Sequence, residues 1–148
     1  AIYRYFKEIT CMPKLQSFKI QPEIELQLEK GIITLRKAIP RTPTELAIKL
    51  MLRIAKCMKV ISSQGIVHMD LKPDNIIVIS DVDVFWKNRK TEVSTYKVQI
   101  IDWGLSEIIY WKTTIKYRSG TLGYMSPEIY TMQPVNYKSD IFSLGVIF

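Results

Sequence analysis

The clearest pattern in this sequence is a one-sided stripe of apolar residues in the stretch that follows Pro43. Apolar positions recur there every three or four residues, and lysines and arginines occupy the other positions, which is typical of an amphipathic helix. Thr42, Pro43 and Glu45 form a capping box with proline at the first helical position, and Gly65 is a natural terminator. We therefore predict a helix from Thr42 to Gly65, whose buried stripe is Ala47, Leu50, Ile54, Cys57, Met58 and Ile61.

Shorter patterns predict the elements that precede this helix. Residues 2–6 are rich in aromatic and β-branched side chains, and residues 24–28 alternate apolar with polar positions. Both patterns predict β-strands, and the segment between them, which contains two prolines, is predicted to be a polar connection. Residues 33–39 predict a short helix that stops at Pro40, because proline cannot continue a helix.

Two further strands are predicted after the long helix. Residues 76–79 form a continuous apolar run typical of a buried strand, and residues 96–101 form a second strand. A charged segment, residues 80–95, separates them, so we expect the two strands to pair as a hairpin. Residues 105–125 have no regular period and read as an irregular loop, whereas Ser126 and the proline after it can begin a short helix.

Composition describes a folded domain and excludes some other classes. The chain has 148 residues, of which 47% are hydrophobic and 24% are charged, so it can build a core. Its net charge is +7, and residues 1–60 hold 12 Lys and Arg against 5 Asp and Glu, while the rest is balanced. These cations are spread along helices and strands, so we expect a solvated basic face and no nucleic-acid partner. No apolar run reaches the roughly 18 residues that a membrane helix needs.

The two cysteines do not predict a structural role. Cys11 and Cys57 are far apart and lack the spacing of metal ligands, so neither a disulfide nor a zinc site is expected. Cys57 is interpreted as core filler on the predicted helix. No signal segment is visible, so we expect a reducing intracellular compartment, cytoplasmic or nuclear.

Acidic and amide side chains point to chemistry in the second half of the chain. Asp70 and Asn75 lie five residues apart on one polar loop, and Asp102 ends a strand that could pair with the strand after Asn75. Converging carboxylate and amide oxygens suit Mg²⁺, and Lys72 would place a positive charge near a metal-bound phosphate. For each residue alone, a turn or capping role is the simpler interpretation. Their combination suggests a phosphate-handling site.

Four motifs carry a family resemblance. Residues 68–75, His-Met-Asp-Leu-Lys-Pro-Asp-Asn, resemble the catalytic loop of eukaryotic protein kinases. Residues 102–104, Asp-Trp-Gly, resemble the metal-binding triplet of that family, with Trp in place of the usual Phe. Residues 120–128 are similar to the end of its activation segment, and residues 139–146 to the start of its large buried helix. The motifs occur in the order of the family, which makes the resemblance specific.

The resemblance implies an α+β, protein-kinase-like two-lobe fold that is only partial here. Residues 2–9 resemble the fourth strand of the small lobe, and residues 24–31 resemble the fifth strand and the hinge. Residues 1–31 would thus be the end of the small lobe and hinge, and residues 32–148 part of the large lobe. The glycine-rich loop, the strand lysine and its helix glutamate do not occur in the sequence, and the chain ends on an apolar run. We therefore expect a fragment of a longer kinase, which would be inactive on its own.

The family also implies roles for individual residues. Asp70 would accept the proton of the substrate hydroxyl, and Lys72 would bind and neutralise the γ-phosphoryl group of ATP. Asn75 and Asp102 would hold Mg²⁺. Thr121 would hydrogen-bond toward Asp70 and Lys72. A lysine and a threonine at these two positions are typical of the serine/threonine class.

Three positions are expected at the adenine. Leu28 would be the gatekeeper before the hinge, and Glu29 would offer its backbone to the base. Ile77 would lie beneath the adenine ring. All three follow from the resemblance alone.

Further positions are expected to be structural. His68 and Trp103 would pack together between the lobes, and Asp140 would hold the backbone of the catalytic loop from below. Glu128 would belong to an ion pair whose arginine is not in this sequence. Met69 replaces the arginine that usually binds a phosphorylated activation segment, so switching by such a pair is not expected.

The resulting hypothesis is a serine/threonine protein kinase that uses ATP and Mg²⁺ and acts on a protein substrate. One alternative is a pseudokinase-type scaffold or a catalytically inactive truncated chain. Another is a small-molecule phosphotransferase of related fold, which would not need the motif of residues 120–128. The intact Asp70, Lys72, Asn75 and Asp102 favour the kinase, since a scaffold has no need for all four.

Overall fold

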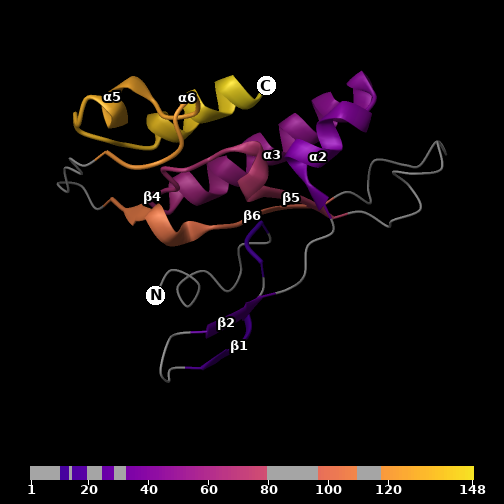
Figure 1. The fold of residues 1–148 in the computed structure, drawn as a ribbon, viewed down its shortest axis with the longest axis horizontal. Helices are drawn as coiled ribbons and strands as arrows, with labels where there is room; N and C mark the ends of the chain where they lie inside the picture. The colour runs from indigo at the N-terminus through magenta and orange to yellow at the C-terminus, as the bar shows by residue number, and fades with distance from the viewer. Residues whose placement is uncertain (1–10, 14, 20–24, 29–32, 80–96, 110–117) are drawn as a thin grey trace.

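The computed structural model describes residues 11–13, 15–19, 25–28, 33–79, 97–109 and 118–148. These residues form both helices and strands, in agreement with the predicted α+β class (Figure 1). The strand predicted at residues 2–6 and the charged connection at residues 80–95 lie outside the described residues.

The first two strands form an antiparallel hairpin. β1 (Leu15–Lys19) pairs with β2 (Glu25–Leu28), with a register irregularity between Leu15 and Ser17. Figure 1 shows this hairpin well away from helices α5 and α6. The sequence predicted β2, but β1 was wrongly assigned to a polar connection. The Leu-Gln-Ser-Phe-Lys stretch of β1 contains no β-branched residue, and the partner strand supplies the hydrogen bonds that its local sequence does not suggest.

A three-stranded antiparallel sheet forms the centre of the described molecule. β5 (Ile76–Ile79) lies between β3 (Ile33–Thr34) and β6 (Lys97–Ile100). Ile76 is opposite Ile100, which confirms the predicted hairpin between these two strands. The prediction of a helix from residue 33 was wrong at its start, because the first two residues add a strand to β5.

Short helical turns connect β3 to the long helix. α2 (Leu35–Ala38) continues directly into the 3₁₀ turn η1 (Ile39–Arg41), so Pro40 lies inside a helical turn and does not stop one. Leu35 and Ala38 are buried and fix α2 against the core. The two residues between them are exposed.

The long helix α3 (Thr44–Ser63) buries the face that the sequence predicts except at Ala47, which is only half-buried. Leu50, Ile54, Cys57, Met58 and Ile61 are all buried. The predicted capping box is wrong: the N-cap residue is Pro43, and the Thr42 hydroxyl donates 2.7 Å back to the Ala38 carbonyl of α2. The predicted terminator is confirmed, since Gly65 follows the helix with a φ of 74°, a left-handed conformation that favours glycine.

The two cysteines are joined, contrary to the sequence prediction. Cys11 and Cys57 form a disulfide with Cα atoms 5.7 Å apart and 46 residues of separation along the chain. The backbone N–H of Ile100 donates to the Cys11 carbonyl at 2.8 Å. The segment at residues 11–13 therefore lies against both β6 and α3, a proximity that linear spacing cannot reveal.

The remaining elements surround one polar loop, residues 68–75. β4 (Ile66–Val67) leads into this loop and pairs with β7 (Glu107–Ile108), a strand inside the stretch that the sequence predicted as irregular. The loop ends in the 3₁₀ turn η2 (Pro73–Asn75), directly before β5. The other elements of this half are η4 (Trp103–Leu105), α5 (Pro127–Tyr130), which begins after Ser126 as predicted, and α6 (Lys138–Ile147).

Two groups of buried apolar side chains support this loop. The larger group joins α3, β5 and β6. A smaller one comprises Val67, Met69, Ile129 and Val135. In the part of the chain that the structure describes, no helix is long and apolar enough to cross a membrane.

Candidate active site

A buried carboxylate fixes the backbone at the start of the polar loop. Asp140 of α6 accepts hydrogen bonds from the backbone N–H groups of His68, at 2.7 Å, and Met69, at 3.0 Å. Asp140 is only 2% exposed, and burial raises its pKa although the two backbone donors lower it. The structure thus places Asp140 beneath the loop, as the resemblance implied, and Met69 adopts a positive φ of 66° there.

His68 connects this loop to the end of β6. Its ring is fully buried, and Nε2 lies 2.9 Å from the Ile101 carbonyl while the backbone N–H of Asp70 donates to Nδ1 at 3.3 Å. These partners assign the proton to Nε2. The ring centroid of Trp103 lies 4.6 Å away at a tilted angle of 59°, so the expected packing of these two residues is present.

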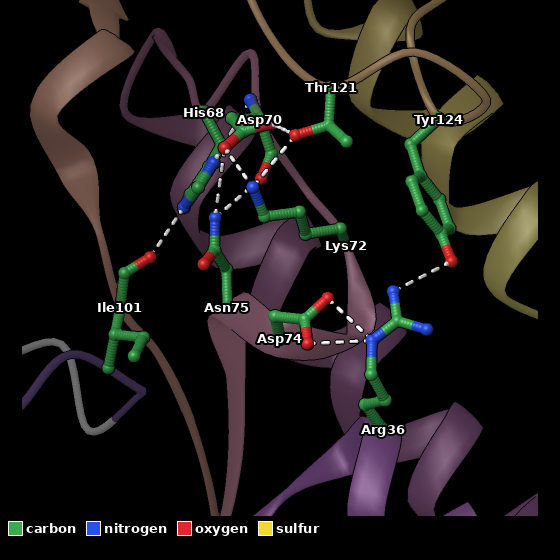
Figure 2. Close-up of polar contacts among 9 residues, drawn as sticks. All are labelled: Arg36, His68, Asp70, Lys72, Asp74, Asn75, Ile101, Thr121 and Tyr124. Carbon is green, nitrogen blue, oxygen red and sulfur yellow. Dashed lines mark hydrogen bonds and ion pairs between the residues drawn. The ribbon is translucent and has the colours of Figure 1, made fainter.

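Asp70, Lys72 and Thr121 form a triangle of polar contacts, shown in Figure 2. The Thr121 hydroxyl donates to Asp70 Oδ1 at 2.6 Å and accepts from Lys72 Nζ at 2.7 Å. Lys72 Nζ also lies 2.9 Å from Asp70 Oδ2. Two residues from the polar loop and one from residues 118–125 therefore meet through a shared hydroxyl and a direct ion pair.

The environment of Asp70 keeps its carboxyl ionised. Burial raises the pKa of Asp70, but the hydrogen bonds from Thr121 and Lys72, the charge of Lys72 and a hydrogen bond from Asn75 together lower it below its ordinary value. A carboxylate of this kind accepts hydrogen bonds well and is a weak base. It is suited to accept a further hydrogen bond from a hydroxyl group and so to orient that group.

Asn75 contacts the triangle directly, and Asp102 lies next to the segment that carries Asn75. The amide nitrogen Nδ2 of Asn75 donates to the Asp70 backbone carbonyl at 2.9 Å and to Asp70 Oδ2 at 3.2 Å, so both of these hydrogen bonds are to Asp70. The backbone N–H of Ile101 donates to the Asn75 carbonyl at 2.9 Å, so Asp102 follows directly beside η2. Asp102 is exposed and has a left-handed conformation, with a φ of 61°.

This donor set fits Mg²⁺ better than a softer metal. One amide oxygen and one exposed carboxylate are hard ligands that leave room for water and phosphate oxygens. Among the described residues, no cluster of three or more His, Cys, Asp or Glu side chains could hold a metal by itself.

The other predicted site residues lie in three places. Ile77 is nearly buried in β5, opposite Thr34 of β3. Leu28 is the last residue of β2, and Glu29 lies outside the described residues. Glu128 of α5 accepts a hydrogen bond from the Ser139 hydroxyl at 2.6 Å. Burial raises the pKa of Glu128, but its hydrogen bonds outweigh this effect and lower it.

Sequence reasoning missed a second polar cluster beside the triangle. Arg36 Nε donates to both oxygens of Asp74, at 2.6 and 2.7 Å, and Arg36 Nη2 lies 3.4 Å from the Tyr124 hydroxyl (Figure 2). No local pattern marks Arg36, which is one of several basic residues in the first 60. Asp74 and Tyr124 lie inside the recognised motifs, but their partner could be found only in three dimensions.

Gly120 was also missed, although its neighbours offered a signal. Its φ is 109°, and a Cβ atom at this position would lie 2.5 Å from the Met69 carbonyl oxygen. The two glycines of the Ser-Gly-Thr-Leu-Gly stretch suggest such backbone demands. The close approach of Gly120 to Met69 brings Thr121 over Asp70.

Comparison with known proteins decides the family. The family model described as "Protein kinase domain" matches residues 16–148. The chain belongs to this family. The resemblance drawn from the four motifs is therefore confirmed, and so is a kinase-like fold of mixed helix and strand content.

Individual kinases show similarity at modest identity. Smooth muscle myosin light chain kinase from Gallus gallus is 35% identical over 100 residues, which cover 68% of this chain and 5% of that protein. The serine/threonine-protein kinase ULK1 from Homo sapiens is 32% identical over 108 residues, covering 72% of this chain and 10% of that protein. A probable myosin light chain kinase from Dictyostelium discoideum is 29% identical over 157 residues, covering 97% of this chain and 38% of that protein. The chain thus spans well under half the length of each of these relatives.

Proposed function

We propose that the protein is a serine/threonine kinase that transfers the γ-phosphoryl group of ATP to a hydroxyl of a protein substrate. The observation that carries this proposal is the Thr121 hydroxyl that joins Asp70 to Lys72. Phosphoryl transfer needs a carboxylate that orients the acceptor hydroxyl and a cation that stabilises charge on the phosphoryl group. Asp70 and Lys72 would supply these two charges next to each other. The family match and the relative that is named as a serine/threonine-protein kinase support this proposal.

In the proposed reaction, Asp70 accepts a hydrogen bond from the substrate hydroxyl and aligns its oxygen with the γ-phosphorus. A bond forms between this oxygen and phosphorus, the bond from phosphorus to the β-phosphate oxygen breaks, and ADP leaves. The hydroxyl proton passes to the Asp70 carboxylate. Because the pKa of Asp70 is lowered, the proton moves late, when the new ester bond has largely formed, and the main contribution of Asp70 is orientation.

Lys72 would stabilise the charge on the transferring group. Its ammonium group is part-exposed at the triangle, so it can contact a phosphoryl oxygen without leaving Thr121. Mg²⁺, when bound, would neutralise phosphate charge, and Asn75 and Asp102 would hold it. Leu28, Glu29 and Ile77 are the proposed adenine contacts.

Residues 1–31 and 32–148 are proposed to belong to the smaller and the larger lobe of this kinase, which would act inside the cell. The glycine-rich loop and strand lysine do not occur in the sequence. Activity should therefore be measured on the full natural protein, with whatever lies on either side of these residues.

The test is phosphate transfer from ATP labelled at the γ-position to a mixed protein substrate, followed by identification of the phosphorylated amino acids. Phosphoserine and phosphothreonine, formed only with Mg²⁺ present, are expected. Phosphotyrosine alone, or phosphate on a small molecule and not on protein, would contradict the proposal. ATP binding without any transfer would support the scaffold alternative.

A further inference from the structure

Arg36 connects three segments that are far apart in the sequence. It lies on α2, whose flanking residues Leu35 and Ala38 are buried, so its backbone has a fixed position. From there its guanidinium reaches Asp74 of η2 and Tyr124 of residues 118–125 (Figure 2). We call these three side chains the Arg36 bridge.

Tyr124 closes the turn that begins at Thr121. Its backbone N–H donates to the Thr121 carbonyl at 3.1 Å, and its own carbonyl accepts from the Ser143 hydroxyl of α6 at 2.7 Å. The hydroxyl of Thr121 binds Asp70 at the other end of the turn. The turn is therefore held by the triangle at one end and by Ser143 and Arg36 at the other.

The other partner of Arg36 belongs to the polar loop itself. Asp74 lies two residues after Lys72 and one before Asn75, in a turn where the Asn75 N–H donates to the Lys72 carbonyl at 2.9 Å. A single guanidinium thus binds the loop that carries Asp70 and Lys72 and the turn that carries Thr121. Arginine can do this because its planar group offers several donors in different directions.

Residue 69 is an uncharged methionine, so its side chain cannot hold the Thr121–Tyr124 turn through an ion pair. Met69 is 3% exposed and packs with Val67, Ile129 and Val135, so the loop meets the following segment there through apolar contacts. Between the two turn residues Thr121 and Tyr124, Leu122 is 70% exposed and Gly123 is also exposed. This exposed turn beside Asp70 is the surface on which a polypeptide flanking the acceptor hydroxyl would lie.

We propose that Arg36 is a positioning residue that holds the Thr121–Tyr124 turn against the polar loop, and so sets the affinity for the protein substrate without requiring a phosphate group. The inference rests on the proposed kinase function. It assigns Arg36 no contact with the reacting atoms. The competing interpretation is an ordinary surface ion pair, because such pairs contribute little when both partners are solvent-exposed.

The variants Arg36→Ala, Arg36→Lys and Tyr124→Phe separate these interpretations in the full natural protein. Lysine can still pair with Asp74, but its single ammonium cannot also serve Tyr124 in the same geometry. Lys37→Ala is the matched control, since it removes the same charge from an exposed position of the same helix. For Arg36→Ala we expect the KM for a peptide substrate to rise about three- to tenfold, which corresponds to the loss of one or two hydrogen bonds. The KM for ATP should be unchanged.

A double-mutant cycle tests the bridge itself. If Arg36 acts through Tyr124, adding Tyr124→Phe to Arg36→Ala should raise the peptide KM no further than Arg36→Ala alone. Arg36→Lys should resemble Arg36→Ala in peptide KM. A peptide KM for Arg36→Ala equal to that of Lys37→Ala would overturn the inference while leaving the kinase function intact. Fully additive effects of the two changes would also overturn it.

Hydrogen exchange provides a readout that does not need catalysis. Amides of residues 121–125 should exchange faster in Arg36→Ala than in Lys37→Ala, while amides of α3 stay equally protected in both. If the wild-type protein transfers no phosphate, the proposed function fails, and this measurement still decides on the bridge. Equal exchange at residues 121–125 in the two variants would reject the bridge whatever the activity.

Discussion

At the scale of single residues, the site depends on one hydroxyl that is shared by two charged groups. Thr121 donates to Asp70 and accepts from Lys72, so it keeps the carboxylate and the ammonium at fixed positions around a common atom. A threonine hydroxyl can do both at once because it is a donor and an acceptor. A side chain of the same shape without the hydroxyl would leave both partners less well placed.

Thr121→Val should lower kcat about fivefold, corresponding to a lost hydrogen bond of about 1 kcal/mol. One donor that lowers the pKa of Asp70 is removed, so this pKa should rise toward the ordinary aspartate value. The acid limb of the pH–rate profile should therefore move to higher pH than in the wild type. Steady-state kinetics across the acidic range measures both effects.

The pH dependence of the stability of Thr121→Val should also change, because the folded pKa of Asp70 is raised in this variant. Because the folded pKa of Asp70 is lowered, the stability that its carboxylate contributes is present above the ordinary aspartate pKa and is lost as the pH falls through the lowered value. In Thr121→Val the folded pKa lies closer to the ordinary value, so this pH-dependent contribution should be smaller and its loss should be complete at a higher pH. Thr131→Val is the control, since the Thr131 hydroxyl donates to the Pro127 carbonyl of α5 and not to Asp70. Identical profiles for the two variants would show that Thr121 does not act on Asp70.

The residues that sequence reasoning found lie inside short motifs, each of which has a recognisable local pattern. Asp70, Lys72 and Asn75 lie on one loop, where spacing and side-chain type already suggest phosphate chemistry. Arg36 could not be found in this way, because it is 88 residues from Tyr124 and has no pattern around it. Its role depends on how α2 packs, which no local rule predicts.

At the scale of elements, a close backbone contact delivers Thr121 to its partners. Gly120 lies so near the Met69 carbonyl that no side chain fits, and its φ of 109° is one that other residues rarely adopt. The loop after β4 and the segment before α5 can therefore approach each other only with glycine at this position. This backbone contact places Thr121 where its hydroxyl can contact Asp70 and Lys72.

Gly120→Ala should lower kcat strongly, on the order of 100-fold, because a shift of about 1 Å in Thr121 would misplace the acceptor site. Gly145→Ala is the matched control, since a Cβ atom at Gly145 in α6 meets nothing within 4 Å. Kinetics and thermal unfolding should be measured on both variants. Activity of Gly120→Ala within twofold of the control would contradict the account of this contact.

The elements differ in how well local sequence predicts them. The stripe of α3 is long and regular, β5 is a continuous apolar run, and β6 alternates polar with apolar residues; these three were predicted correctly. β7 has only two residues, which is too short for any period to appear, and its pairing with β4 defines it. The predicted N-cap of α3 was wrong because the Thr42 hydroxyl donates to the Ala38 carbonyl and does not cap α3.

At the scale of the whole molecule, one covalent link joins distant parts of the described chain. The Cys11–Cys57 disulfide connects the segment before β1 to the middle of α3. Sequence spacing gave no indication of it, because the pairing follows only from the docking of residues 11–13 on the core. The proposed intracellular location would expose this bond to cellular reductants.

Reduction of the disulfide should lower the stability of the protein. In the chain-entropy description, a cross-link between residues 46 positions apart stabilises by about 4 kcal/mol. The melting temperature should therefore fall when dithiothreitol is added to the wild type. A double variant with serine at both positions should melt at the lower temperature and not respond to the reductant. Two titratable thiols in unreduced protein would contradict the link.

The central claim is that the loop from His68 to Asn75 performs phosphotransfer and is not a remnant in a binding protein. The most direct measurement compares the wild-type full natural protein with Asp70→Asn for ATP binding and for phosphate transfer to protein in the same preparation. We predict that Asp70→Asn still binds ATP in the presence of Mg²⁺ but transfers phosphate at least 100-fold more slowly, because orientation of the acceptor hydroxyl is lost. Equal transfer by the two proteins, or none by the wild type, would contradict the account.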